Sequence, residues 1–471
     1  MNLLSKFLDI AEKRRDVIAV ISGDGQRISY GELAERSAQH AAYWQGKGIR
    51  KGDRVLLAMP VGIDLYAAIA GLWRLGAVIV FPEPAMGLKG LRHAVRIAEP
   101  QAVLTSGIYR ILNIIIPGLW RVKHKLRLGM GTGAPICEQV VSDHPALISF
   151  TSGSTGNPKA IVRSHAFLMA QNDCVSQMLA SDKDNEIDLV AFPVFVIANL
   201  GSGVTSVLPD WKLSQHDLAD ASAICRLIAR ENISRALVPP SICEILARHN
   251  TGPGLQAIFT GGGPIFPDLM RRMMAAMPGT RIMAVYGSTE AEPISHLMLE
   301  DMSAADWAEM ENGGGLLAGT PVPETAVRII DDEIVVTGDH VNKGYLDGVG
   351  DAENKVAMDG DIWHRTGDAG RFDAQGRLWL RGRWSAKAGA YYPFELEVAA
   401  RSWDGVTAAA LIPSRQPATL AISGKEPSPG YWQAKAAALG DIIVTAMAEI
   451  PMDRRHRSKV DYAALNDQLK R

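Results

Sequence analysis

Residues 148–159 of the chain read Ile-Ser-Phe-Thr-Ser-Gly-Ser-Thr-Gly-Asn-Pro-Lys, and no other segment is as informative about the fold. The end of an apolar strand runs into hydroxyl side chains and glycines, and a lysine follows. Gly153 and Gly156 let the backbone turn tightly, so that its N–H groups can face an anion without a Cβ in the way. Lys159 adds a point charge. Further hydroxyl donors come from Thr151, Ser152, Ser154 and Thr155. The segment therefore predicts a phosphate-binding loop.

This loop differs from the P-loop of nucleoside triphosphatases, GxxxxGK[ST]. Its two glycines lie too close together and Lys159 is displaced. A surface turn is the alternative interpretation. A turn, however, does not need four hydroxyls, two glycines and a lysine at this spacing.

The composition is that of an ordinary globular protein with more than one domain. At 471 residues, 47% of them apolar and 21% charged, the chain is too long for one compact core. A net charge of −2 gives no reason to expect nucleic acid as a partner. Neither a secretory signal nor a stretch of the ~18–20 apolar residues of a membrane span is found. The cysteines form no CxxC pair, which excludes a disulfide framework or zinc cluster and predicts a cytoplasmic protein. They are Cys137, Cys174, Cys225 and Cys243.

Helical and strand-like patterns alternate along most of the chain. Ser29 and Glu32 have the spacing of a capping box and predict the start of a helix. Short apolar runs such as 55–59 and 236–238 are separated by helical stretches such as 63–75. This alternation predicts an α/β protein with stacked, mostly parallel sheets covered by helices.

The pattern of apolar and turn-forming residues changes twice toward the C-terminus. After about residue 312, β-like runs with turn glycines predict a small β subdomain over about 313–382. We expect it to complete a large domain of residues 1–382. Residues 384–471 are expected to form a small, mobile α+β domain, and the linker is expected within Arg383–Lys387.

Further motifs follow the loop in sequence. Gly261-Gly-Gly-Pro264 comes after an apolar run, and Tyr286-Gly-Ser-Thr-Glu-Ala291 comes next. Arg365-Thr-Gly-Asp368 and Gly382-Arg383 follow, and a basic segment near the C-terminus ends at Lys459. In this order the motifs resemble those of the adenylate-forming superfamily of AMP-dependent synthetases and ligases. That superfamily contains acyl-CoA synthetases, nonribosomal-peptide adenylation domains and luciferases.

The resemblance implies a role for each motif. Tyr286 would stack on adenine, Thr289 would contact phosphate, and Glu290 would hold Mg²⁺ through a hard carboxylate oxygen. Asp368 would bind the ribose hydroxyls, with Arg383 as its partner. The expected ATP- and AMP-binding residues are Thr151, Ser152, Gly153, Ser154, Thr155, Gly156, Lys159, Gly261, Gly262, Gly263, Tyr286, Gly287, Ser288, Asp368 and Arg383.

Lys459 is expected to act in catalysis together with Thr289 and Glu290. In the family, a lysine at this place swings in to contact the carboxylate and the α-phosphate. Both groups are anionic, so a cation between them offsets their repulsion and stabilises the transition state.

Several short segments look most like the olefin β-lactone synthetases and the neighbouring fatty-acyl ligases. These are residues 192–195, 205–210, 286–293 and 453–459. Val196 stands where many relatives have a histidine, and Ala386 stands where most have a hinge aspartate, in a loop about four residues shorter. The substrate pocket is expected to include Phe195, Val196, Asn199, Gly263 and Ala291.

The resemblance allows more than one reaction. The first is activation of a fatty or other hydrophobic acid to acyl-AMP, with ATP and Mg²⁺, followed by transfer to CoA or to an acyl or peptidyl carrier protein. The second keeps adenylation but ends when a 3-hydroxyl closes a β-lactone. The third is an inactive nucleotide-binding homologue, and a plain ATPase is a fourth. Retention of Lys459 argues against a protein that only binds nucleotide.

Residues Tyr109–Leu128 form a basic amphipathic stretch that Pro117 interrupts. It has two interpretations. It is either a peripheral helix that buries one face, or a segment that lies on a membrane surface and makes a peripheral contact there.

Overall fold

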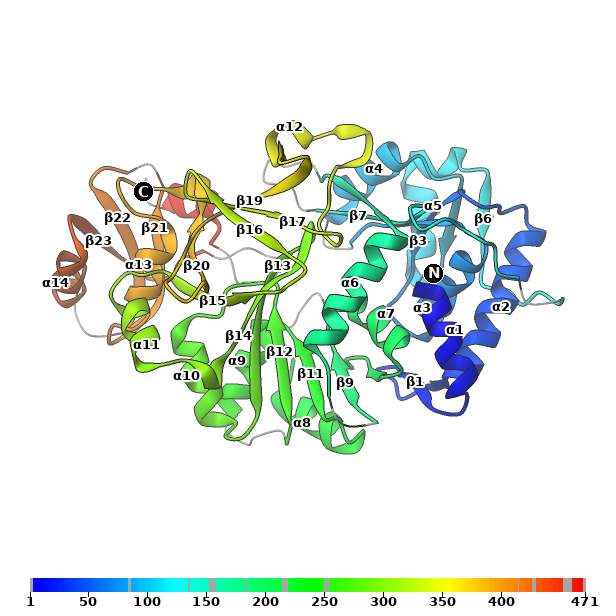
Figure 1. Ribbon diagram of the computed structural model, residues 1–471, viewed down its shortest axis with the longest axis horizontal. Helices are drawn as coiled ribbons and strands as arrows, with labels where there is room; N and C mark the ends of the chain where they lie inside the picture. The colour runs from blue at the N-terminus through cyan, green and yellow to red at the C-terminus, as the bar shows by residue number, and fades with distance from the viewer. Residues whose placement is uncertain are drawn as a thin grey trace. The chain divides into compact units, whose positions relative to one another are not determined.

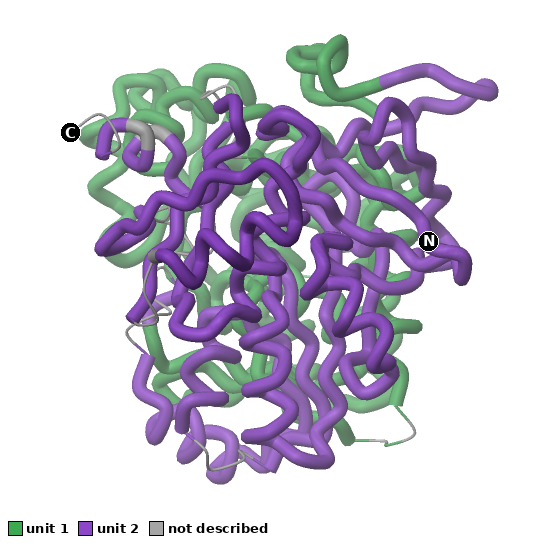
Figure 2. The backbone as a smooth tube through the Cα atoms, turned by 90° about the vertical axis from the view of Figure 1, so that its left-hand side faces the viewer, with its two compact units in different colours: residues 1–211, 339–355 green, residues 212–338, 356–471 purple. Residues whose placement is uncertain are grey.

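The computed structural model describes residues 3–83, 86–133, 136–151, 158–181, 183, 185–213, 219–249, 254–413, 415–425, 429–451 and 460–468. The chain forms two compact units (Figure 2). Unit 1 contains Met1–Trp211 and Asp339–Lys355, and unit 2 contains Lys212–Gly338 and Val356–Arg471. The expected division into a large and a small domain near Arg383 stays a prediction.

Unit 1 contains a sheet in the order β6-β5-β3-β4-β7-β8 (Figure 1). All neighbouring pairs in it are parallel except β7 and β8. Its strands are β3 (Arg54–Ala58), β4 (Val78–Phe81), β5 (Ala102–Thr105), β6 (His124–Leu126), β7 (Pro145–Phe150) and β8 (Ala160–Ser164). The helices that follow β3 and β4 are α3 (Ile63–Arg74) and α4 (Gly87–Ala98).

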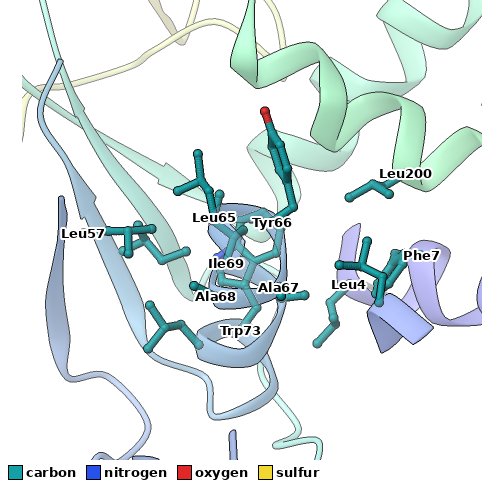
Figure 3. Packing of buried hydrophobic residues seen from close by; sticks show 14 of the residues in the cluster. Leu4, Phe7, Leu57, Leu65, Tyr66, Ala67, Ala68, Ile69, Trp73 and Leu200 are labelled. Atoms are coloured by element: carbon teal, nitrogen blue, oxygen red, sulfur yellow. The ribbon is translucent and has the colours of Figure 1, made fainter. Parts of the chain in front are cut away.

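Helix α3 lies in the centre of the core of unit 1. Its residues Leu65–Arg74 are all buried, which agrees with its apolar sequence on every side. Figure 3 shows Tyr66, Ile69 and Trp73 of this helix packed with Leu57 and other apolar side chains. The indole N–H of Trp73 donates to the carbonyl of Ala146 at 3.0 Å, so this buried polar group is satisfied.

Unit 1 also contains four neighbouring strands in the order β9-β10-β1-β2. They are β1 (Ile18–Ile21), β2 (Arg27–Ser29), β9 (Ile187–Val190) and β10 (Thr205–Val207), and they accompany α1 (Leu3–Lys13), α2 (Tyr30–Gly46), α6 (His165–Met178) and α7 (Pro193–Ser202). The predicted capping box begins α2. The backbone N–H of Glu32 donates to the Ser29 hydroxyl, and the Ser29 N–H donates to the Glu32 carboxylate.

Unit 2 begins with parallel strands and continues with antiparallel ones. The parallel strands are β11 (Arg235–Val238), β12 (Ala257–Gly261) and β13 (Arg281–Ser288), accompanied by α8 (Ala221–Arg230), α9 (Pro240–His249) and α10 (Pro267–Ala276). From β13 onward the order is β13-β14-β15-β20-β19-β17-β16, and each of these pairs is antiparallel. These strands are β14 (Ala291–Met298), β15 (Leu316–Pro321), β16 (Ala326–Ile330), β17 (Glu333–Thr337), β19 (Asp361–Phe372) and β20 (Leu378–Arg383). Helix α11 (Ala304–Glu311) joins β14 to β15.

A small C-terminal sheet has the order β21-β22-β23. Its strands are β21 (Val406–Ile412), β22 (Ala418–Gly424) and β23 (Ile442–Met447), with α13 (Pro393–Ala400), α14 (Pro429–Leu439) and α15 (Tyr462–Gln468). Leu396 of α13, Trp403 and Leu420 share one apolar cluster there. The predicted α/β class, with helix-covered parallel sheets and a small C-terminal sheet, is confirmed. Within the described ranges, none of the helices combines the length and apolarity that a membrane crossing demands.

Glu397 lies inside this C-terminal region. Its side chain is buried, and its Oε1 accepts hydrogen bonds from the Leu411 N–H at 2.9 Å and the Tyr462 hydroxyl at 3.3 Å. Burial raises the pKa of Glu397 from 4.5 to about 7. The unfolded chain therefore loses this proton more readily than the folded chain does. The contribution of Glu397 to the free energy of unfolding is therefore undiminished below pH 4.5, and it falls as the pH rises from there through 7.

We expect the substitution Glu397→Gln to stabilise the protein above pH 7 by roughly 1–3 kcal/mol and to change little at pH 4.5. Glutamine keeps the Oε1 acceptor and removes the buried charge. Urea unfolding at several pH values measures the effect, with the exposed Glu449→Gln as the matched control. An equal change at all pH values would contradict the prediction.

Candidate active site

The predicted phosphate loop connects β7 to β8 in unit 1. The Thr151 N–H donates to the Lys159 carbonyl at 3.0 Å, so a backbone hydrogen bond closes the loop at its base. The Nε2 of His93, on α4, lies 3.0 Å from the carbonyl oxygen of Pro158. The predicted anion-binding residues Ser152, Gly153, Ser154, Thr155 and Gly156 lie outside the described residues.

The side chain of Lys159 extends over the ring of Tyr345. Its Nζ lies 5.2 Å from the ring centroid, and the Nζ of Lys355 lies 5.0 Å from the same centroid. Gly350 allows this approach, because a Cβ there would lie 2.9 Å from Cδ of Lys159. Tyr345 also forms a backbone bridge with Ile161 of β8. Two cations therefore gather at one aromatic ring beside the loop.

Tyr345 and Lys355 were not predicted as site residues. Each lies almost two hundred residues from the loop along the chain, and a single tyrosine or lysine has no motif of its own. The only signal was the sequence Lys343-Gly-Tyr-Leu-Asp347, which joins a turn glycine to an aromatic residue.

The predicted pocket residues of unit 1 lie on α7. The Phe195 ring packs edge-on against Phe192 at 5.8 Å and is half-buried. Val196 is fully buried in the core. Asn199 is also buried, and its amide donates to Asp188 at 3.0 Å and Ser206 at 3.1 Å. Asn199 thus supports the strands of unit 1, and the pocket roles of these residues stay predictions.

Two predicted motifs of unit 2 lie on adjacent strands. Gly261, the last residue of β12, pairs with Val285 of β13, so the glycine motif lies directly beside Tyr286. A Cβ at Gly261 would approach the Val285 carbonyl oxygen to 2.7 Å, and Gly262 has a φ of +78°. The chain needs glycine at both positions, for a close approach and for a left-handed turn. Gly263 directly follows them.

Thr289 and Glu290 lie at the tip of the β13–β14 hairpin. Ser288 pairs with Ala291 across the two strands, which leaves these two residues as the turn. A Cβ at Gly287 would lie 2.9 Å from the carbonyl oxygen of Ala291, so this position also requires glycine. Ala291 itself is fully buried.

The carboxylate of Asp368 joins Tyr286 to Arg383. The Tyr286 hydroxyl donates to Asp368 Oδ2 at 2.9 Å, and Arg383 Nη1 lies 3.2 Å from Asp368 Oδ1. Burial, together with the charge of Asp368, raises the pKa of Tyr286 well above its usual value, so the phenol stays protonated. The charge of Asp368 also raises the pKa of Arg383, and Tyr286 and Glu290 add to this effect. Tyr286, Glu290, Asp368 and Arg383 therefore form one electrostatic group.

A buried glutamate, Glu333, sets the direction of Asp368. Its carboxylate accepts from the N–H of Gly367 at 3.0 Å and forms an ion pair with Arg365. The Thr366 hydroxyl donates to the Ile334 carbonyl at 2.8 Å and accepts from the Asp368 N–H at 3.1 Å. Gly367 has a φ of +73°, and the strand register shifts here. The Arg365–Asp368 motif is thus a β-bulge held in place by Glu333.

Glu333 was not predicted as part of the site. In the sequence it is a charged residue directly before the apolar run 334–337, and no motif includes it. What identifies Glu333 is its burial beside Arg365, and this is visible only in the folded chain.

The AMP-binding enzyme family model matches residues 7–346. An olefin β-lactone synthetase of Stenotrophomonas maltophilia is 27% identical over 470 residues, covering 87% of this chain and 85% of that protein. A feruloyl-CoA synthase of Amycolatopsis sp is 27% identical over 421 residues, covering 82% and 81%.

Solved structures share the fold. The amide bond synthetase McbA from Marinactinospora thermotolerans superimposes with a TM-score of 0.83 at 20% identity, covering 99% of each chain. The o-succinylbenzoate coenzyme A synthetase of Bacillus subtilis in complex with AMP gives a TM-score of 0.79 at 19% identity, covering 99% of this chain and 98% of that one.

We expect Glu333→Gln to destabilise unit 2 by roughly 1–3 kcal/mol, because it leaves Arg365 without its buried anionic partner. AMP affinity should fall about tenfold, since the bulge then no longer holds Asp368 in place. Urea unfolding and calorimetric titration with AMP measure the two effects, and the exposed Glu353→Gln serves as the control. Unchanged AMP affinity would show that the bulge does not position Asp368.

Proposed function

Because the chain belongs to the AMP-binding enzyme family, we propose that it activates a hydrophobic carboxylic acid and passes the acyl group to the thiol of CoA or of a carrier protein. As an adenylate-forming enzyme, it joins a carboxylic acid to AMP at the expense of ATP. The observation that most supports our residue assignment is the group formed by Tyr286, Asp368 and Arg383 beside the glycines of β12.

In the first half-reaction a carboxylate oxygen attacks the α-phosphorus of ATP, and the bond to the β-phosphate oxygen breaks. We assign adenine stacking to Tyr286 and ribose binding to Asp368. An ionised carboxylate has about four acceptor positions. The hydrogen bond from Tyr286 and the ion pair with Arg383 use two of them, which leaves acceptors for the ribose hydroxyls.

The residues at the hairpin tip fit a magnesium site. Mg²⁺ is typically bound by one or two carboxylates together with substrate phosphates, so a large protein ligand cluster is not required. Among the described residues no group of three or more His, Cys, Asp or Glu side chains comes together, so the assignment rests on the single carboxylate of Glu290. Glu290 would hold the ion, which neutralises charge on the departing pyrophosphate. Thr289 would donate a hydroxyl to phosphate from the same turn.

Lys459 is assigned to the contact between the carboxylate and the α-phosphate. It lies outside the described residues. On either side of its segment, the Asp461 N–H donates to the Pro451 carbonyl at 2.9 Å. Helix α15 follows, and its Tyr462 hydroxyl donates to Glu397.

We expect Lys459→Ala to lower the rate of adenylation by roughly 10²–10³-fold, the effect of losing one preorganised charge-stabilising group. ATP binding should weaken far less, because the other assigned nucleotide contacts remain. Pyrophosphate exchange and ATP titration measure the two quantities, with Lys425→Gln as a control for the loss of a surface charge. Near-normal formation of acyl-adenylate would rule out this assignment.

The second half-reaction depends on the linker that we place at Arg383–Lys387. Trp384–Ala386 form a single 3₁₀ turn, and the Trp384 indole donates to the Asp331 carbonyl at 2.8 Å. Asp331 and Asp332 form the turn between β16 and β17, and both have positive φ.

Asp332 holds groups on both sides of this linker. Its carboxylate lies 2.9 Å from Arg381 and 3.6 Å from Lys387, and it accepts from the Tyr392 hydroxyl at 3.1 Å. Rotation about the linker would have to break the contacts to Lys387 and Tyr392. In this chain Asp332 therefore offers a contact that stabilises one orientation of the C-terminal segment.

We expect Ala386→Pro to leave acyl-adenylate formation intact and to block the second step, so that acyl-adenylate accumulates. Proline fixes φ near −65° and also restricts Ser385. A single-turnover assay that follows both acyl-adenylate and final product measures the effect, and Ala386→Gly is the control that retains rotation.

Two other results would change the assignment of the linker. Unchanged formation of product by Ala386→Pro would mean that the rotation is not used. Loss of both steps at an unchanged melting temperature would place Ala386 inside the adenylation site.

A β-lactone-forming reaction is the second candidate. It is favoured by the similarity to olefin β-lactone synthetases and by Ala386 in place of the hinge aspartate. Here the 3-hydroxyl oxygen of the acyl group attacks the carbonyl carbon, its proton is lost, and the bond from that carbon to AMP breaks. No thiol is needed.

One experiment separates these candidates. A panel of fatty, aromatic and 3-hydroxy acids is tested for ATP–pyrophosphate exchange, with and without CoA, and the products are analysed by mass spectrometry. CoA thioesters support the first proposal, and β-lactones formed without CoA support the second. If none of the acids in the panel supports ATP–pyrophosphate exchange, both proposals are contradicted and a nucleotide-binding homologue is favoured.

A further inference from the structure

Residues Gly107–Arg121 of unit 1 carry a surface for which the adenylation chemistry has no use. They form the short helical turns η2 (Gly107–Ile111), α5 (Leu112–Ile115) and η3 (Pro117–Arg121), and η3 begins at the proline. Figure 1 shows α5 near α4 and the edge strand β6. The Arg92 side chain of α4 reaches the Ile115 carbonyl at 3.4 Å.

One face of this segment is packed inward. Leu112, Ile116 and Leu119 are buried in a cluster with Val95 of α4. These residues are all that a peripheral helix needs in order to hold its place on the domain. The interpretation as an ordinary peripheral helix therefore accounts for them, and for the partly buried Tyr109 and Ile115 that pack against the same cluster, but not for the exposed apolar residues.

The opposite face carries a second set of large apolar side chains. Ile108 is 82% exposed, Ile114 is 70% exposed and Trp120 is 61% exposed, and Ile111 lies among them, also exposed. Single exposed apolar residues are common, but such a concentration marks an interaction surface. The Trp120 indole N–H already donates to the Ile114 carbonyl at 2.9 Å, so its ring can enter an apolar medium without losing a hydrogen bond to water.

Exposed basic side chains are frequent on the same segment and on the neighbouring α4. Residues 86–133 contain one acidic residue, Glu99, in a chain whose net charge is −2. The basic residues of the same range are exposed, and they are Lys89, Arg92, Arg96, Arg110, Arg121, Lys123, Lys125 and Arg127. The local charge is thus opposite in sign to that of the whole protein.

We propose that residues 107–127, with the exposed face of α4, form a docking surface for an anionic lipid membrane. The isoleucines and Trp120 would enter the boundary between headgroups and acyl chains, and the lysines and arginines would contact lipid phosphates. This surface stands independently of the substrate and of the second reaction step.

Other partners fit these residues less well. A nucleic acid would satisfy the cations, but its phosphate backbone offers nothing to exposed isoleucines. A second copy of the chain, paired symmetrically through this surface, would bring like charges together. An anionic membrane provides both an apolar layer and negative charge at the required depth.

Helix α4 is part of the docking surface and also contacts the end of the phosphate loop. Its exposed face carries Lys89 and Arg92, while His93 contacts the carbonyl of Pro158 at the end of the loop. Docking would therefore bring an element that touches the nucleotide loop close to a lipid surface. An enzyme that activates a lipidic acid would find its substrate there.

Co-sedimentation of the full chain with vesicles tests the proposal. We expect binding to vesicles of phosphatidylcholine with phosphatidylglycerol, weaker binding to phosphatidylcholine alone, and weakening by salt. The double substitution Arg121→Gln with Lys123→Gln should lower affinity for anionic vesicles about 25-fold, at roughly fivefold per charge. Ile114→Ser with Trp120→Ala should lower it on the order of tenfold.

Matched controls change exposed residues of unit 1 outside the surface. Lys13→Gln and Val349→Ser should bind vesicles like the unchanged protein. Adenylation of a short water-soluble acid and the melting temperature should be the same for all variants, which shows that each is folded. Should the apolar double variant melt early, the charge variant alone decides.

Three results would overturn the proposal. They are the absence of sedimentation with anionic vesicles, equal binding by the surface and control variants, and equal binding to neutral and anionic vesicles. Light scattering adds a fourth: if the surface substitutions convert a dimer to a monomer, this face is an interface between copies.

Discussion

The carboxylate of Asp368 is the group on which the site of unit 2 depends. It receives the hydroxyl of Tyr286 from β13 and the guanidinium of Arg383 from β20, two strands that do not pair with each other. The bulge held by Glu333 gives this carboxylate its direction. Because the Glu333 carboxylate is buried and ion-paired, a change in the bulge would leave a buried charge without its partner, which is costly.

Asp332, the residue directly before Glu333, is a second carboxylate that holds several groups together. Its neighbour Glu333 supports the site, while Asp332 itself contacts Arg381, Lys387 and Tyr392 around the linker. Two adjacent acidic residues, Asp332 in the turn and Glu333 at the start of β17, thus hold the bulge of the proposed ribose site on one side and the proposed linker on the other. We expect substitutions at these two neighbours to be coupled, because the effects of mutations at residues in direct contact do not simply add.

Each of the two units carries its own kind of groups. Unit 2 contains Gly261, which the backbone of β13 approaches closely, together with the ring of Tyr286 and the carboxylate of Asp368. Unit 1 supplies the closed loop, the cations around Tyr345, and a basic apolar surface on α4 and the turns that follow β5. Positive charge beside the loop and on the surface favours anions in general, which agrees with the phosphate and the lipid headgroup that we propose for these two places.

Local sequence was sufficient for much of this description. Apolar runs such as 55–59 predicted buried parallel strands, Ser29 and Glu32 predicted the start of α2, and the motif order led to the family. These features depend on residues close together in the chain, where spacing alone determines which side chains share a face. Only the folded chain revealed that Glu333 supports Asp368, that Tyr345 lies under Lys159, and that Ile108 and Ile114 point outward. Burial and ion pairing depend on neighbours that are distant in sequence, so a single glutamate, tyrosine or isoleucine carries no local sign of its role.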